Sequence, residues 1–468
     1  MKSSDQTVPF RPGSWLISAT ASLCFFLNAC GGGDSPAVAT AAPISAPISA
    51  PNTYTIGGTV SGLSGSGLVL QDNAGDDLAM ATNGGFTFAT ALSSGAGYAV
   101  TIKTQPTSPK QTCSVTAGNG TATANVTNVT VNCVLVPMLT YVTNWVDSNV
   151  SVYTGNPTTG ALTQISGSPF AIGAHPQAVA VAPNGKFAYI AANNIYAYTI
   201  DATTGGLSLV AGSPVAAGLN PISVTVDPSG KFAYAANNSS ASVSAYTINT
   251  ATGALTQVAG SPFAAGASPR SVTVDPSGKF AYVTNGASNT ISGYTINATT
   301  GVLTPIAGSP FSTPLPTTIA IDPSGKFAYV TSSNNGTVSA FSVDATTGAL
   351  TAVVGSPYTA GSNPYAVTID RSGKFAYVTN DGDSTISAYT INTTTGALAP
   401  MTGSPFATGS APEFIAVDPA GKFAYVASRG SANVYAYSVD ATTGALTSIA
   451  GSPFAAGAGT DGIAIVAP

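Results

Sequence analysis

One short motif recurs through most of this chain and limits what the chain can fold into. The tetrapeptide Lys-Phe-Ala-Tyr occurs six times, and its tyrosines follow one another at intervals of 45 to 48 residues. These tyrosines are Tyr189, Tyr234, Tyr282, Tyr329, Tyr377 and Tyr425. A divergent seventh copy is centred on Tyr141. A fixed period of this length indicates one supersecondary unit that is repeated and stacked against its neighbours.

Each repeat has the pattern of four short strands separated by turn residues. In one repeat the strands are expected at 271–275, 280–285, 291–296 and 303–306, which are rich in β-branched and aromatic residues. The connecting turn Asp-Pro-Ser-Gly has Asp first, Pro second and Gly fourth, as a tight β-turn prefers. Repeated four-stranded units of this kind are typical of a β-propeller. The recurring Asp and Lys residues are therefore interpreted as scaffold.

The two ends of the repeat region predict how the ring closes. The region opens with the second-strand sequence around Tyr141 and finishes with residues 462–466, which have the pattern of a first strand. Pairing these two segments would complete the seventh blade and leave no open edge. The sequence therefore predicts an all-β fold, with a seven-bladed β-propeller over residues 137–468 whose terminal strands close one blade.

A smaller domain is expected before the propeller. Residues 54–136 contain six or seven short strand patterns separated by Gly and Asn turns, which favour a small β-sandwich. Cys113 and Cys133 both fall in this segment. A disulfide between them would close a loop of ~20 residues and add roughly 3 kcal/mol of stability.

The N-terminus predicts export. Lys2 and Arg11 precede an apolar stretch at 15–27, so residues 1–29 are predicted to be a signal peptide. Residues 30–53 consist mostly of Gly, Ala, Pro, Ser and Thr and predict a flexible linker.

The end of this signal resembles the bacterial lipobox. It reads Leu-Asn-Ala-Cys and ends at Cys30. The resemblance implies that Cys30 is diacylated and becomes the first residue of the mature protein. Gly31 follows it in place of the Asp that retains lipoproteins at the inner membrane, so an outer-membrane lipoprotein is expected. The alternative is an ordinary signal peptide with an incidental cysteine.

Composition limits the partners. Only 7% of residues are charged and the net charge is −5, without a basic cluster that nucleic acid would require. Acidic turns such as 381–383 supply too few ligands for calcium. We expect no metal, no cofactor and no nucleic-acid partner. The expected partners are a membrane, through the lipid anchor, and a small sugar-like or lactone-like ligand or a protein.

The strand motif Tyr-Val-Thr-Asn at 141–144, 282–285 and 377–380, with the Asp-Pro-Ser-Gly-Lys turns, resembles the seven-bladed lactonase propellers. That family includes 6-phosphogluconolactonases and muconate-lactonising enzymes. The resemblance implies lactone hydrolysis, with Glu413 and Arg429 matching an acid–arginine pair of the enzymes. The chain departs from them two blades earlier, where Thr317 replaces a histidine and residues 332–336 lack an Asp-Arg pair.

Comparison of the repeats with one another indicates where a site would lie. The uniform turns share one face of the propeller, and the variable residues share the other, where functional loops on a rigid scaffold gather. The chain's single histidine, its single glutamate and several polar or aromatic residues map to that variable face. The candidate binding residues are Trp145, His175, Gln177, Arg270 and Tyr365, and the candidate catalytic residues are Glu413 and Arg429.

These residues support two main functions. The first is a binding or interaction module anchored at the outer membrane, with a pocket for a small anionic or sugar-like ligand. The second is a lactonase in which Glu413 is the general base and Arg270 or Arg429 steadies the oxyanion. A stalk or matrix protein that uses its edges for contact is a third possibility.

Overall fold

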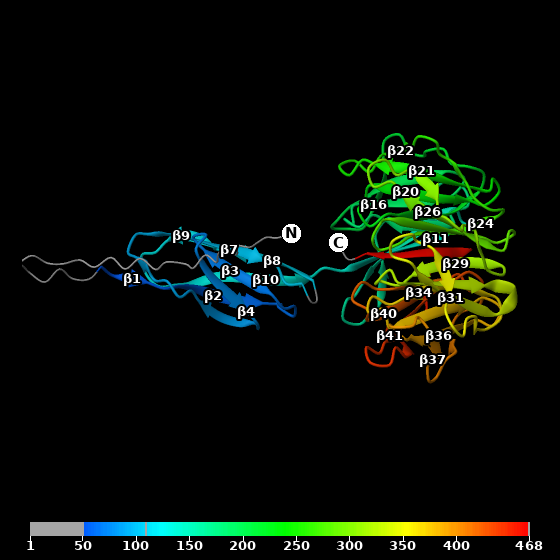
Figure 1. The fold of residues 1–468 in the computed structure, drawn as a ribbon. Coiled ribbons are helices and arrows are strands. Elements are labelled where there is room, and N and C mark those ends of the chain that lie inside the picture. The colour runs from blue at the N-terminus through cyan, green and yellow to red at the C-terminus, as the bar shows by residue number, and fades with distance from the viewer. Residues whose placement is uncertain (1–50, 108–109, 467–468) are drawn as a thin grey trace, which may run out of the picture. The chain divides into compact units, whose positions relative to one another are not determined.

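The structure is a computed structural model that describes residues 51–107 and 110–466 (Figure 1). Apart from one 3-10 turn, η1 (Ser333–Asn335), every regular element in these ranges is a β-strand. The all-β prediction is therefore confirmed. The predicted signal peptide, Cys30 and the linker up to residue 50 lie outside the described residues.

Ten strands precede the propeller and pair only with one another. They are β1 (Thr53–Tyr54), β2 (Ile56–Ser61), β3 (Leu68–Asp72), β4 (Asp76–Met80), β5 (Gly84–Thr87), β6 (Leu92–Ser93), β7 (Gly97–Thr104), β8 (Gln111–Thr116), β9 (Asn119–Thr121) and β10 (Val126–Leu135). One sheet has the order β5-β2-β10-β8, the other has the order β4-β3-β7-β9, and β1 pairs with β6. Ile56 and Val131 of the first sheet share a buried cluster with Leu70 of the second, so the sheets pack as a sandwich.

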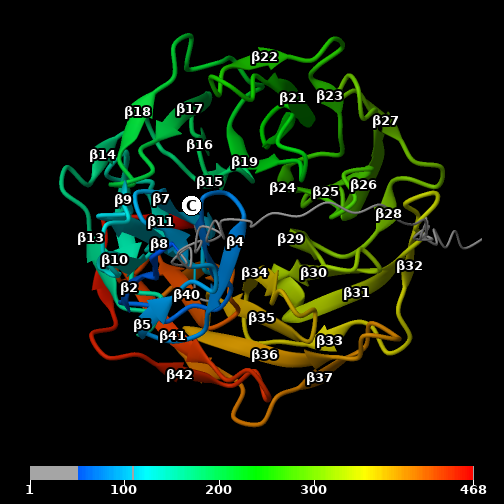
Figure 2. The same ribbon diagram turned by 90° about the vertical axis from the view of Figure 1, so that its left-hand side faces the viewer.

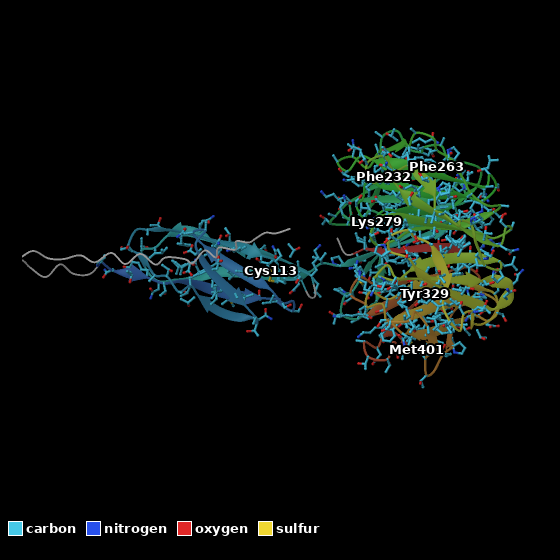
Figure 3. All side chains as sticks on the ribbon, in the orientation of Figure 1. Cys113, Phe232, Phe263, Lys279, Tyr329 and Met401 are labelled. Carbon is cyan, nitrogen blue, oxygen red and sulfur yellow. A yellow bond between two sulfur atoms is a disulfide. The ribbon has the colours of Figure 1, made fainter. Side chains whose placement is uncertain are left out.

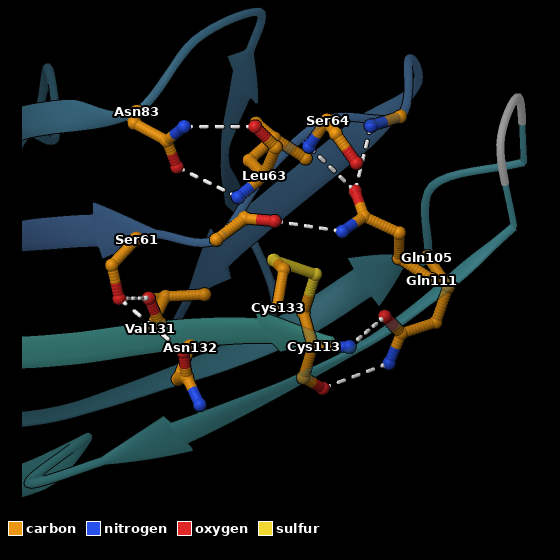
Figure 4. Close-up of a disulfide and its surroundings, with 12 residues drawn as sticks. Ser61, Leu63, Ser64, Asn83, Gln105, Gln111, Cys113, Val131, Asn132 and Cys133 are labelled. Atoms are coloured by element: carbon orange, nitrogen blue, oxygen red, sulfur yellow. Dashed lines mark hydrogen bonds between the residues drawn. A yellow bond between two sulfur atoms is a disulfide. The ribbon is translucent and has the colours of Figure 1, made fainter. Parts of the chain in front are cut away.

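The predicted disulfide is present in this sandwich (Figure 4). Cys113 on β8 and Cys133 on β10 are direct partners in the antiparallel register, and both are buried. The side chain of Gln105 accepts a hydrogen bond from the Cys113 amide at 2.7 Å and donates one to its carbonyl at 3.0 Å. The bridge thus joins two neighbouring strands, and at the same point Gln105 satisfies the backbone amide and carbonyl of the edge strand β8.

The other strands form seven antiparallel blades around a central axis (Figure 2). The innermost strands are, from blade 1 to blade 7, β44 (Thr460–Val466), β15 (Ala178–Val181), β19 (Pro221–Val226), β24 (Pro269–Val274), β29 (Pro316–Ile321), β34 (Pro364–Ile369) and β39 (Pro412–Val417). The second strands are β11 (Met138–Asn144), β16 (Phe187–Ala191), β20 (Phe232–Asn237), β25 (Phe280–Asn285), β30 (Phe327–Ser332), β35 (Phe375–Asn380) and β40 (Phe423–Ser428).

Each blade continues outward from these strands. The third strands are β12 (Asn149–Gly155), β17 (Ile195–Ile200), β21 (Ser242–Ile248), β26 (Thr290–Ile296), β31 (Thr337–Val343), β36 (Thr385–Ile391) and β41 (Asn433–Val439). The fourth strands are β13 (Leu162–Gln164), β18 (Leu207–Leu209), β22 (Leu255–Gln257), β27 (Leu303–Pro305), β32 (Leu350–Ala352), β37 (Leu398–Pro400) and β42 (Leu446–Ser448).

Six blades carry a fifth strand that the repeat pattern did not predict. These two-residue strands pair with the third strand, and they are β14 (Phe170–Ala171), β23 (Phe263–Ala264), β28 (Phe311–Ser312), β33 (Tyr358–Thr359), β38 (Phe406–Ala407) and β43 (Phe454–Ala455). Each begins just after a Gly-Ser-Pro segment. The serine of that segment accepts a hydrogen bond from a third-strand amide, as Ser309 does from Gly293 at 2.9 Å. The segment therefore fixes the outer edge of its blade.

The ring closes as the sequence predicts. β44, drawn in red beside β11 in Figure 1, pairs antiparallel with β11 from Leu139–Val466 to Asn144–Thr460. The innermost strand of blade 1 therefore comes from the C-terminal part of the chain, and its other strands come from just after the sandwich. This pairing removes the open edges that a linear array of blades would have.

The Lys-Phe-Ala-Tyr motif holds neighbouring blades together. Tyr234 donates a hydrogen bond from its buried hydroxyl to the Gly301 carbonyl of the next blade at 3.1 Å. Gly301 has φ +74°, and a Cβ there would lie 2.4 Å from a ring carbon of Phe232, so this turn requires glycine. The same tyrosine–glycine bond recurs at all seven junctions, including Tyr425 to Gly160 across the closure. Tyr329 and Phe232 are labelled within the propeller in Figure 3.

Candidate functional site

Each blade supplies one side chain to the mouth of the propeller, and in six of the seven blades this side chain comes from a bulge in the innermost strand. In blades 1 and 3 to 7, the register between the first and second strands shifts just after the first paired residue of the innermost strand. A bulge bends the strand and re-aims its side chain, and bulges are frequent next to functional sites. The residues at this position, from blade 1 to blade 7, are Asp461, Gln177, Ile222, Arg270, Thr317, Tyr365 and Glu413. We call them the mouth ring.

The order of the blades fixes which members of the mouth ring face each other. Each innermost strand contacts its two neighbours, and β39 contacts β44, so blade 7 adjoins blade 1. Glu413 and Asp461 therefore occupy neighbouring positions, with Tyr365 on the far side of Glu413. Arg270 in blade 4 lies three positions from each acid. In a seven-membered ring this places the guanidinium opposite the two carboxyl groups.

A polar cavity of about 190 Å³ lies within this ring. Side chains from all seven blades line it, namely Gln177, Asn220, Ile222, Asn238, Arg270, Thr317, Thr318, Tyr365, Phe414 and Asp461. Gln177 and Asn220 are joined by a hydrogen bond of 3.4 Å. Arg270 is exposed and makes no ion pair among the described residues. The cavity therefore offers a free cationic donor, several amides and one carboxyl group to a small polar ligand.

Below the mouth the channel wall is made of small side chains. Ser223, Thr225, Ser271 and Thr273 are partly exposed along the innermost strands, as the sequence indicates. Phe414 is the exception, because it lines the cavity and meets Tyr365 edge to face, with ring centroids 5.5 Å apart and planes at 81°. One wall of the cavity is therefore aromatic.

The two acids of the mouth ring are almost completely buried. Glu413 is 4% exposed and Asp461 is 3% exposed. Burial raises the pKa of Asp461 well above its usual range, and the neighbouring Glu413 raises it further. Burial also raises the pKa of Glu413, while Arg429 opposes that change. Two carboxyl groups that interact this closely share protons and titrate as a pair.

The environments of the two acids differ. Arg429 Nη1 lies 3.3 Å from Glu413 Oε1, whereas Glu413 Oε2 is buried and has no hydrogen-bond partner among the described residues. Asp461 lines the cavity and makes no side-chain hydrogen bond within the described ranges. Glu413 therefore has a cationic partner, Arg429, that does not line the cavity. Asp461 is the acid that a ligand in the cavity would contact.

The phenol of Tyr365 completes this half of the mouth. Burial raises its pKa well above the ordinary value, and the nearby Asp461 and Glu413 add to that shift. Tyr365 therefore stays neutral at physiological pH. Its hydroxyl is within hydrogen-bonding reach of Glu413, and it can donate to that carboxylate or to a ligand in the cavity.

A stack of rings covers the outer side of Arg429. The Arg429 guanidinium carbon lies 5.1 Å from the centroid of the Trp145 ring, within cation–π range. Trp145 in turn packs on His175, with centroids 4.6 Å apart and planes at 32°. His175 Nδ1 lies 3.2 Å from the Trp145 carbonyl oxygen. These residues form the aromatic clamp, defined as Trp145, His175 and Arg429.

The predicted site residues thus divide into two groups. Gln177, Arg270 and Tyr365 line the cavity, whereas Trp145, His175 and Arg429 form the aromatic clamp beside it. Glu413 joins the groups, since it contacts Arg429 and neighbours Asp461. Sequence comparison of the repeats missed Asp461 and Phe414. Asp461 follows Thr460, which pairs with Asn144 as Pro412 pairs with Ser428, so alignment of the closing strand with the other repeats could have found it.

No group of three or more His, Cys, Asp or Glu side chains in residues 51–107 and 110–466 is arranged to hold a metal ion. No helix in the same ranges is long and apolar enough to cross a membrane.

The fold and the mouth define a closed seven-bladed propeller with a polar cavity that is lined by residues of all seven blades. The profile of the family described as "Lactonase, 7-bladed beta-propeller" matches residues 98–268, 259–362 and 353–461. Because these matches span more than half of the chain, the chain belongs to this lactonase propeller family. The predicted family resemblance is confirmed.

Solved structures of the same fold are similar over the propeller. A protein from Bacteroides uniformis proposed to be a 6-phosphogluconolactonase is 20% identical, with a TM-score of 0.62 over 71% of this chain and 100% of that chain. The periplasmic gluconolactonase of Pseudomonas aeruginosa is 18% identical, with a TM-score of 0.60 over 71% of this chain and 99% of that chain. At this level of identity the likeness shows the fold. None of the curated proteins compared matches the sequence significantly.

Proposed function

We propose that this protein hydrolyses a lactone at the mouth of the propeller. The observation that carries the proposal is the buried pair Glu413–Asp461, which borders a polar cavity with the free guanidinium of Arg270 opposite. Carboxyl groups with raised pKa values in a cleft are characteristic of acid–base catalysis. Membership of the lactonase propeller family supports this reading over a binding module. The P. aeruginosa relative, named a gluconolactonase, suggests an aldonolactone as the first substrate class.

Asp461 is the proton-transfer group in this proposal, because it lines the cavity and Glu413 does not. As water attacks the lactone carbonyl, the new C–O bond forms and the ring C–O bond breaks. Asp461 gives its proton to the departing ring oxygen and receives one from the attacking water. Arg270 and the neutral phenol of Tyr365 stabilise the negative charge that develops on the carbonyl oxygen. The product is a hydroxy acid, which releases a proton at neutral pH.

The test is proton release by the purified full chain on a panel of γ- and δ-aldonolactones. Asp461→Asn is expected to lower kcat by about 10²- to 10⁴-fold. Arg270→Ala is expected to lower kcat/KM by about 10²-fold or more. Asp440→Asn is the matched control, since Asp440 is an exposed turn acid whose carboxylate accepts amides of its own turn, and it should leave turnover unchanged. Turnover that survives Asp461→Asn would overturn the assignment of the acid.

A second function, ligand binding without turnover, is favoured by one observation. Thr317 occupies the mouth-ring position at which the resemblance implies a histidine, and its hydroxyl is buried without a partner among the described residues. The same panel separates the functions. Lactones that bind in calorimetry but are not hydrolysed would support the binding module, and binding should then be lost in Arg270→Ala.

We also propose that the protein is exported and anchored to the outer membrane by acylation of Cys30. The lipobox-like sequence that ends at Cys30 supports this proposal, as does the disulfide, because disulfides persist in oxidising compartments. Labelled palmitate should be incorporated into the full chain in a Gram-negative host. Labelling that persists in Cys30→Ser would overturn the assignment.

A further inference from the structure

The aromatic clamp is a feature that the lactonase proposal does not use. Trp145 follows β11 in blade 1 and His175 precedes β15 in blade 2, whereas Arg429 follows β40 in blade 7. Side chains from three consecutive blades, 7, 1 and 2, therefore meet in one stack. None of the three side chains lines the cavity. The side chains stack in the order His175, Trp145 and Arg429, and Arg429 forms the ion pair with the Glu413 carboxylate.

The stack restrains a side chain that would otherwise be mobile. The side chain of Arg429 is 39% exposed, and an exposed arginine gains little from a single ion pair because ordering its long side chain costs entropy. The face of Trp145, 5.1 Å away, limits the positions that the guanidinium can take. His175 packs on the same indole, and its Nδ1 lies 3.2 Å from the main-chain carbonyl oxygen of Trp145, which keeps the two rings together. The ion pair with Glu413 is therefore preorganised.

Preorganisation at Glu413 has a consequence for its neighbour. The charged and titratable groups that act on Glu413 are Arg429, Asp381, Tyr365 and Asp461. Of these only Arg429 carries a positive charge. A fixed guanidinium stabilises negative charge on Glu413, and negative charge on Glu413 disfavours a second charge on Asp461. Arg429 also lowers the pKa of Asp461, but Glu413 raises that pKa by more, and only Glu413 forms the ion pair with Arg429.

We propose that Trp145 is a positioning residue, which clamps Arg429 onto Glu413 and thereby makes Glu413 the charged member and Asp461 the neutral member of the acid pair. As a role in turnover this inference rests on the proposed lactonase function, because a neutral Asp461 is the form that donates a proton to the ring oxygen. The clamp itself is measurable without any substrate. Failure of the clamp and failure of the lactonase proposal are therefore distinguishable.

The composition of the chain makes the measurement direct. Glu413 is the only glutamate in the sequence, so glutamate labelled with ¹³C at its side-chain carboxyl gives a single titrating carboxyl resonance in the full chain. In the wild type the titration of this resonance reports the apparent pKa of Glu413 within the acid pair. In Trp145→Ala we expect that pKa to rise by about 0.5, since a guanidinium that has lost its cation–π contact is held less firmly beside the carboxylate.

Two further variants keep the test decisive. Trp145→Phe retains a ring with weaker cation–π attraction and should raise the pKa of Glu413 by less than Trp145→Ala does. Leu219→Ala removes a 69% exposed side chain from another loop at the same mouth and should leave the pKa unchanged. If Trp145→Ala does not fold, the rise in Trp145→Phe carries the test.

An unchanged or lowered pKa in the Trp145 variants would overturn the proposal, as would an equal rise in Leu219→Ala. A rise in the Trp145 variants, with no turnover of any lactone by the wild type, would leave the clamp established and reject the hydrolase. If the wild type is active, Trp145→Ala should lower kcat and leave KM nearly unchanged, since the clamp does not touch the cavity.

Discussion

The two faces of the propeller both bury carboxylates, and they treat them in opposite ways. On the face of the uniform turns, Asp322 is 5% exposed and its carboxylate accepts hydrogen bonds from the amides of Ser324, Lys326 and Phe327 and from the Ser324 hydroxyl. On the mouth face, Glu413 is equally buried, but its partners are the side chains of Arg429 and Tyr365, and no backbone amide among the described residues bonds its carboxylate. Asp461 has no hydrogen-bond donor among the described residues.

This difference separates scaffold from site more sharply than residue type does. A buried carboxylate whose oxygens are all satisfied stabilises the turn around it, and removing it leaves donors unpaired. A buried carboxylate without such partners costs stability, so its presence needs another reason. At the mouth, the reason that we propose is chemistry on a ligand.

The largest effect is expected where a scaffold acid is removed. Asp322→Ala leaves buried backbone donors without acceptors and should lower the free energy of unfolding by about 3 kcal/mol. Chemical denaturation of the full chain measures it. Asp344→Ala, in an exposed turn where water can replace the carboxylate, is the control and should cost about 1 kcal/mol or less. Equal losses for the two variants would mean that burial of the scaffold acids adds nothing.

A mouth acid should behave in the opposite way. Asp461→Asn removes a buried group that is costly to ionise and should stabilise the protein by about 2 kcal/mol at pH 8. The native pKa of Asp461 is raised, so its stabilising contribution is complete below the unfolded value of about 3.9 and is lost as pH rises through the native value. The advantage of Asp461→Asn should therefore vanish near pH 3.5 and grow toward pH 8. A pH-independent difference between the two proteins would contradict this linkage.

The smallest effect concerns the tyrosine–glycine hydrogen bonds between neighbouring blades, which support both faces of the propeller. Tyr329→Phe removes the hydrogen bond from a buried hydroxyl to the Gly396 carbonyl at 3.0 Å and should cost about 1 kcal/mol. Tyr358→Phe is the control, because its hydroxyl bonds the Val354 carbonyl at the exposed surface. Thermal unfolding should distinguish them by a few degrees. A loss as small as that of the control would show that the blades are held by apolar packing alone.

The sequence predicted the scaffold well because the scaffold is local. The turn acid Asp275, its Pro and its Gly lie within four residues, and the same pattern returns in most blades. The pairing of β11 with β44 could be predicted because the repeat region begins without a first strand and ends with a first strand that has no second strand after it. The disulfide followed from two cysteines in one small domain.

The mouth was predicted only in part, because its contacts join residues that are far apart in the chain. Glu413, Arg270 and Tyr365 stood out as exceptions within their repeats. Asp461 did not, since the first strand of blade 1 is separated from the rest of its repeat by the whole propeller. The contact of Trp145 with Arg429 depends on the same closure, and no local pattern encodes it.

The mouth ring takes one residue from the same place in every blade, and none of its seven members belongs to the tyrosine–glycine junctions or the Asp-Pro-Ser-Gly turns. A gene with this layout can alter the ligand chemistry one codon at a time, while the codons that specify the ring remain untouched. Residues of the mouth and residues of the scaffold are therefore encoded at separate positions, and each repeat adds one position at which selection can act on the mouth.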